Sequence, residues 1–180
     1  DGGHSRAHVV GGFAPMAILL PSMMAGMRLQ MRWPRLDVEL LRPVTRRDAV
    51  EDLAHTLIVE TLMFWLAITA ALVAAALVWA PEAFLAGLPV WLIALGSLAV
   101  QVLGAGASFW LATRRSMLVY LGGQLAVHLL VTLPLAGLAM AYYESPVFYP
   151  IAVVGIVIVL AAGGLLFCAA HRRWLQVDLG

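Results

Sequence analysis

The chain has 180 residues, of which 63% are hydrophobic and 12% are charged, with a formal net charge of +1. Soluble domains of this size are nearer half apolar and a quarter charged, so this composition excludes a soluble domain and predicts an integral membrane protein. All eleven residues counted as Lys or Arg are arginine, and the absence of lysine excludes a Walker A nucleotide site and a Schiff-base lysine in this chain.

Apolar runs follow one another along the whole chain. The first covers about residues 10–27, which is just long enough to cross a bilayer. Four further spans are predicted at about residues 56–79, 90–113, 117–142 and 148–170. We therefore predict an all-α fold, a polytopic transmembrane helical bundle with about five spanning helices in a single transmembrane domain, residues 1–180.

The segment 28–55 between the first two spans is the only long polar stretch. Six of the eleven arginines lie between Arg28 and Arg47, interleaved with acidic residues. A mixed-charge segment cannot lie in lipid, so we expect it to be exposed to water and to be the part best able to meet a soluble partner.

Local signals divide this polar segment into two helices. Pro34 suits the first turn of a short amphipathic helix, which Pro43 ends. Thr45, followed three residues later by Asp48, predicts the N-cap and capping partner of the next helix.

The arginines also predict an orientation. Ten of the eleven lie in segments 28–47, 114–115 and 172–173, which alternate threading places on one side of the membrane. The opposite loops, 80–89 and 143–147, contain no arginine. By the positive-inside rule we expect a multi-pass protein of a bacterial inner membrane, with the N-terminus of the chain outside and its C-terminus cytoplasmic. Because the first residue is Asp, we expect that an N-terminal portion with one further helix precedes it.

Glu60 is the one acidic residue inside a predicted span. It lies about three residues, or roughly 5 Å, from the start of that span, so its side chain can reach the cytoplasmic interface. Two interpretations stay open: an interfacial or interhelix hydrogen bond, or a gate on a substrate path.

A polar stripe runs along the fourth predicted span. Tyr120, Gln124, His128 and Thr132 recur every four residues and therefore share one helix face, and Gln101 in the third span is a candidate partner. Such a stripe must face protein or a water-filled path. It can hold helices together or line a translocation path. No metal site and no cofactor are expected.

The polar segment resembles a motif of the permease subunits of type-2 ABC transporters. In that family a cytoplasmic segment of the form Glu-x-Leu-Leu…Pro-Val-(Ser/Thr)-Arg-x-(Asp/Glu) precedes a membrane helix. Here the segment reads Glu39-Leu40-Leu41-Arg42-Pro43-Val44-Thr45-Arg46-Arg47-Asp48, without the residue between the acid and the leucine pair. The tail Arg172-Arg173-Trp174-Leu175-Gln176-Val177-Asp178 is also similar to the end of such permeases. The hydropathy pattern matches helices two to six of a six-helix permease.

The resemblance implies a half-transporter of an exporter that dimerises with a second permease copy or paralogue in the lipid bilayer. A separate cytoplasmic ABC ATPase would dock on segment 32–52 and hydrolyse ATP, so no catalytic residue and no nucleic-acid partner are expected for this chain. The implied docking residues are Pro34, Arg35, Asp37, Glu39, Leu40, Leu41, Pro43, Thr45, Arg46, Arg47 and Asp48.

Two other functions remain open from the sequence. One is a non-catalytic membrane assembly or anchoring subunit, which would lack a path across the dimer. The other is an intramembrane enzyme using Glu60 and His128, which requires the two side chains to converge on one cavity.

Overall fold

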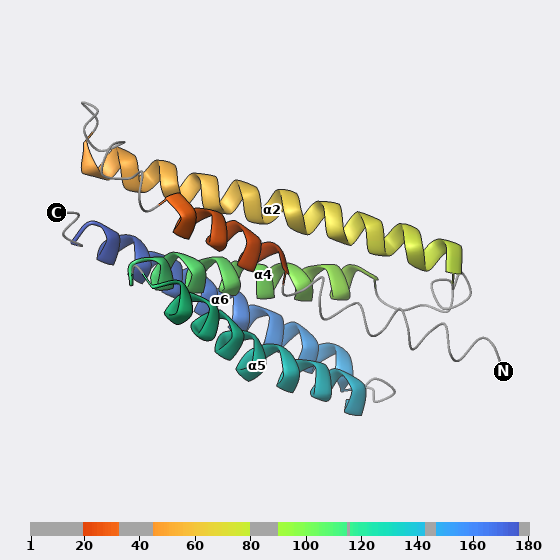
Figure 1. Ribbon diagram of the computed structural model, residues 1–180. Coiled ribbons are helices and arrows are strands. Elements are labelled where there is room, and N and C mark those ends of the chain that lie inside the picture. Colours follow the sequence, from red (N-terminus) through yellow and green to blue (C-terminus); the bar gives the residue numbers. More distant parts are fainter. Residues whose placement is uncertain (1–19, 33–44, 80–89, 115, 143–146, 177–180) are drawn as a thin grey trace.

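The computed structural model describes residues 20–32, 45–79, 90–114, 116–142 and 147–176 (Figure 1). These residues are almost entirely helical, and no strand occurs among them. The helices are an unlabelled one at residues 20–32, α2 (Arg46–Trp79), α4 (Val90–Ala112), α5 (Met117–Tyr142) and α6 (Phe148–Trp174). The predicted all-α fold is therefore confirmed.

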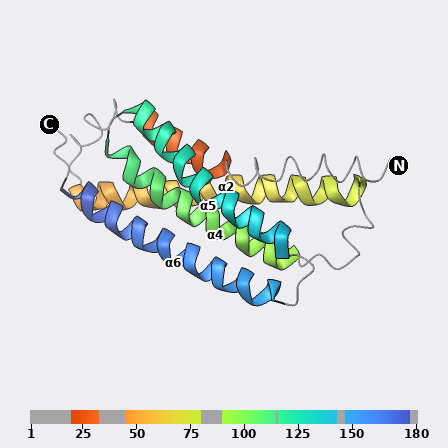
Figure 2. The ribbon, with the colours of Figure 1, turned by 90° about the horizontal axis from the view of Figure 1, so that it is seen from below.

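The helices form an elongated bundle in which the chain reverses direction from each described helix to the next (Figures 1 and 2). Helix α4 occupies the middle of the bundle and packs against α2, α5 and α6. Its apolar segment is 56% buried, whereas that of α6 is 11% buried. The outer helices therefore present apolar surface that only a lipid environment or another apolar surface can cover.

Three helices are long and apolar enough to cross a membrane, at Arg46–Ala71, Ala94–Ala112 and Tyr149–Trp174. These segments support an integral membrane protein. The described apolar part of α5, Met117–Val131, is shorter, so the number of five spans stays a prediction.

Small residues set the close contact between α4 and α6. A Cβ atom placed on Gly163 would lie 2.7 Å from the backbone nitrogen of Leu103, and one on Gly106 would lie 2.8 Å from the carbonyl oxygen of Gly163. Both distances are shorter than a van der Waals contact, so the two backbones meet where glycine leaves room for them.

An aromatic cluster joins the same helices near the end of the bundle where the C-terminus lies. The ring of Phe109 stacks on those of Phe167 and Trp174, with centroids 5.1 and 5.6 Å apart. The indole Nε1 of Trp174 donates a hydrogen bond of 2.8 Å to the carbonyl oxygen of Phe109. The buried indole N–H is thus satisfied while the rings fill the core.

Two helix ends differ from the predicted spans. The first described helix continues past residue 27 to residue 32, where Arg28 forms an ion pair with Glu60 and Leu29 is buried in the core. Helix α6 continues past residue 170 to Trp174, because this side chain is buried against Phe109. Both extensions make contacts with distant residues.

Candidate functional site

Helix α2 begins with the predicted capping box. The backbone N–H of Asp48 donates to Thr45 Oγ1 at 3.2 Å, and the backbone N–H of Thr45 donates to Asp48 Oδ2 at 3.3 Å. The Thr45 hydroxyl also donates to Asp48 Oδ2 at 2.6 Å. Two backbone donors at the helix start are therefore satisfied, and a carboxylate lies at the positive end of the helix dipole.

The first turns of α2 have one buried face and one charged face. Val50, Leu53 and Leu57 are buried in the core. On the other side Arg47 Nε donates to Glu51 Oε1 at 2.8 Å, and these side chains are 77% and 51% exposed. The charged face is consequently open to a partner while the apolar face fixes it to the bundle.

The other predicted docking residues divide into two groups. Arg46 is half-buried at the start of α2, next to the capping box. Outside the described residues lie Pro34, Arg35, Asp37, Glu39, Leu40, Leu41 and Pro43, and with them the predicted short amphipathic helix.

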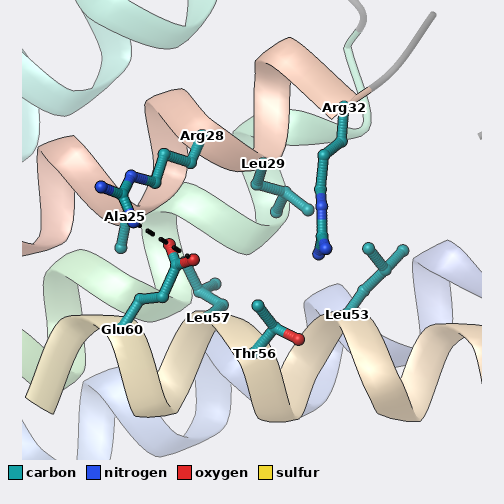
Figure 3. A pocket seen from close by; sticks show the side chains of 8 residues that line it. All are labelled: Ala25, Arg28, Leu29, Arg32, Leu53, Thr56, Leu57 and Glu60. Atoms are coloured by element: carbon teal, nitrogen blue, oxygen red, sulfur yellow. Dashed lines mark ion pairs between the residues drawn. The ribbon is translucent and has the colours of Figure 1, made fainter. Parts of the chain in front are cut away.

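Glu60 pairs with a residue of helix 20–32 (Figure 3). Arg28 Nη1 lies 3.6 Å from Glu60 Oε1, and the two side chains are 55% and 28% exposed. The Arg28 guanidinium also lies over the ring of Phe64, 5.0 Å from its centroid. This geometry agrees with an interhelix contact for Glu60. The pairing of Arg28 with Glu60 could have been predicted from the sequence, because antiparallel threading brings the end of the first span beside the start of the second.

A small cavity lies beside this ion pair, between helix 20–32 and α2. Its volume is about 20 Å³, enough for about one water-sized group. It is lined by Ala25, Arg28, Leu29, Arg32, Leu53, Thr56, Leu57 and Glu60.

The predicted stripe on α5 faces protein and connects three helices. The hydroxyl of Tyr120, which is fully buried, donates to the carbonyl oxygen of Met23 at 3.0 Å and lies 3.3 Å from Ser108 Oγ. Ser108 Oγ in turn donates to the carbonyl oxygen of Ser22 at 3.0 Å. These bonds hold helix 20–32 against α4 and α5.

The amides of two glutamines extend this network. Gln124 Nε2 donates to the carbonyl oxygen of Gly104 at 3.1 Å and to Ser108 Oγ at 2.5 Å. Gln101 Oε1 accepts from the backbone N–H of Ser22 at 3.1 Å. Gln101 is thus a member of the buried network through Ser22. Ser22 is not among the residues predicted from the sequence, although its spacing of four from Gly26 is typical of helix contacts made by small residues.

His128 follows Gln124 on the same face of α5 but forms none of the hydrogen bonds of this network. Its side chain is 3% exposed, and neither ring nitrogen has a hydrogen-bond partner. Its Cε1 atom lies 3.6 Å from the position of a Cβ atom on Gly104, which places the ring against α4. Ser22 Oγ and Gln124 Oε1 are also buried without partners. The side chain of Thr132 lies outside the described residues.

The cavity beside Glu60 does not include His128. The eight residues that line the cavity at Glu60 belong to helix 20–32 and α2, and His128 is not one of them. Within the described ranges, no three His, Cys, Asp or Glu side chains are arranged to hold a metal ion. The geometry therefore adds no support to the intramembrane enzyme.

Together the fold and these contacts define the class of the protein: an all-helical bundle with three candidate membrane-spanning helices and a charged, capped start of α2. Comparison of the chain with family models, with curated proteins and with solved structures finds no match. Its function is therefore inferred from its residues and their geometry.

Proposed function

We propose that the chain is the membrane-spanning permease subunit of an ABC-type exporter, driven by a separate cytoplasmic ATPase that docks on segment 32–52. The observation that carries the proposal is the construction of α2. Its 34 residues form one helix, about 50 Å long, that joins a charged, capped start to an apolar remainder. A force applied to the exposed start can thus be transmitted along the helix into the bundle.

The arrangement of the arginines supports the proposed orientation. Helix 20–32, α4 and α6 end, and α2 and α5 begin, at the same end of the bundle (Figure 1). That end carries Arg32, Arg47, Arg114 and Arg172. The positive-inside rule assigns this end to the cytoplasm, where a soluble ATPase can reach α2. The proposed location is accordingly a bacterial inner membrane.

A second candidate function is a non-catalytic assembly or anchoring subunit. The observation in its favour is that Tyr120 and Gln124 each bond to Ser108 and to the carbonyl oxygen of another helix. These two residues of the polar stripe thus make contacts between helices of this chain. The two functions differ in their requirement for an ATPase, which makes that partner the decisive test.

The test uses a tagged chain expressed in its native cells and purified in mild detergent together with any ATPase bound to it. We expect the ATPase to co-purify with the unaltered chain and to be lost with the exchanged variant R47E/E51R. This variant keeps two opposite charges at spacing i, i+4 but exchanges their positions. The stability of the helix therefore changes little.

The matched control is R172E, which reverses an exposed arginine of α6 at the same end of the bundle. Retention of the ATPase by R172E and its loss from R47E/E51R support docking at α2. Equal retention by both variants, or no associated ATPase with the unaltered chain, contradicts the permease proposal and favours the anchoring subunit.

A further inference from the structure

The groove between helix 20–32 and α2 contains an unbalanced positive charge. Arg28 is paired with Glu60 at 3.6 Å, which leaves Arg32 as the second cation beside the same cavity. Arg32 is half-buried, and no described residue forms an ion pair or hydrogen bond with it. The three charges of the groove therefore sum to +1.

The side chain of Arg32 points into the groove. Figure 3 shows its guanidinium extending from the end of helix 20–32 toward α2, and Thr56 of α2 lines the same cavity. A guanidinium and a hydroxyl are both hydrogen-bond donors, and arginine matches the geometry of phosphate oxygens. The available donors thus favour an anionic oxygen ligand.

The remainder of the groove is apolar. Its floor is formed by buried side chains of Ala25, Leu29, Leu53 and Leu57. Next to Arg28 on the helix face, Met24 and Met31 are 41% and 60% exposed. An anion-binding group beside exposed methionines suits an amphiphile whose acyl chains cover the methionines better than a free inorganic ion.

We propose that this groove binds the phosphate of an anionic phospholipid, with one phosphate oxygen entering the cavity between Arg32 and Thr56. The cavity of about 20 Å³ holds about one oxygen-sized group, so the rest of the headgroup lies outside it. A phosphodiester carries one negative charge, which balances the groove. The site shares Arg32 with the edge of the proposed docking segment 32–52, but it requires only that the chain lies in a membrane.

Binding is tested by native mass spectrometry of the delipidated full chain in a neutral detergent, titrated with phosphatidylglycerol, phosphatidylcholine or glycerol 3-phosphate. We expect phosphatidylglycerol to bind most tightly. Its apparent dissociation constant should rise about ten-fold or more in R32Q, since a charge-assisted hydrogen bond is removed. The matched control R47Q removes the same charge at an exposed position paired with Glu51 and should change binding less than two-fold.

A second variant tests whether the negative charge of Glu60 weakens the binding of an anionic lipid. E60Q removes the anion that competes for Arg28, so it should strengthen phosphatidylglycerol binding several-fold, whereas a purely structural role of this ion pair would weaken it. E60Q is measured separately from R32Q and keeps the test valid if R32Q does not fold.

Three results would overturn the proposal. The first is equal phosphatidylglycerol binding by R32Q and R47Q, and the second is weaker binding by E60Q. The third is binding of glycerol 3-phosphate as tight as that of phosphatidylglycerol, which would assign the groove to soluble phosphate esters. Tight phosphatidylglycerol binding that depends on Arg32, with weak binding of glycerol 3-phosphate, supports the phospholipid site.

Discussion

The close contact of α4 and α6 gives a sharp prediction at two neighbouring glycines. A Cβ atom on Gly163 would lie 2.7–2.9 Å from backbone atoms of Val102 and Leu103, whereas a Cβ atom on Gly164 meets nothing within 4 Å. Both glycines lie inside α6, so both replacements by alanine gain the same helix propensity, about 0.5–1 kcal/mol. Only G163A must also push two helix backbones apart.

Overpacking of this kind costs about 1–3 kcal/mol. The two variants should therefore differ in their free energy of unfolding by about that amount, with G163A the less stable. For a chain of this length the difference corresponds to roughly 2–12 °C in melting temperature. Both variants are compared with the unaltered chain by thermal unfolding in one detergent, followed by tryptophan fluorescence. A melting temperature of G163A equal to or above that of G164A would refute the described packing of α4 on α6.

Three further predictions concern polar contacts, and the same unfolding measurement checks each of them. Y120F removes a buried hydroxyl that bonds to Met23 and contacts Ser108, and we expect a loss of about 1 kcal/mol; no loss would argue against this network. T45A removes the N-cap of α2 and should cost about 0.5–2 kcal/mol, whereas unchanged stability would contradict the capping box. H128L replaces an unpartnered buried ring by an apolar side chain, so stability should be unchanged or raised by up to about 2 kcal/mol; a clear loss would show that His128 has a partner.

The sequence predicted features that depend on near neighbours in the chain. Thr45 and Asp48 are three residues apart, so their capping contact needs only the local helix start. The common face of Tyr120, Gln124 and His128 follows from the helical period in the same way. In both cases the residues and their spacing determine the geometry before any tertiary contact forms.

The partners of these residues could not be predicted in the same way. Tyr120 bonds to the carbonyl oxygen of Met23, 97 residues away, and that contact exists only after helix 20–32 has docked on α4 and α5. The extension of helix 20–32 past residue 27 likewise includes a residue, Arg28, whose partner Glu60 lies on another helix. When the partner of a charged residue on another helix is unknown, a charged residue at the end of an apolar run indicates the end of a span.

The central claim is that the exposed charged face of α2 is a docking surface for a soluble ATPase. Its most direct test places a photoactivatable crosslinking residue at Glu51, whose side chain is 51% exposed, in the chain expressed in living cells. The matched control places it at Val119, which is 48% exposed on α5. We expect position 51, and not position 119, to crosslink to a protein with a phosphate-binding loop. The crosslinked protein is identified by mass spectrometry. Crosslinks from position 51 to this chain alone, or to the same proteins as from position 119, would contradict the central claim.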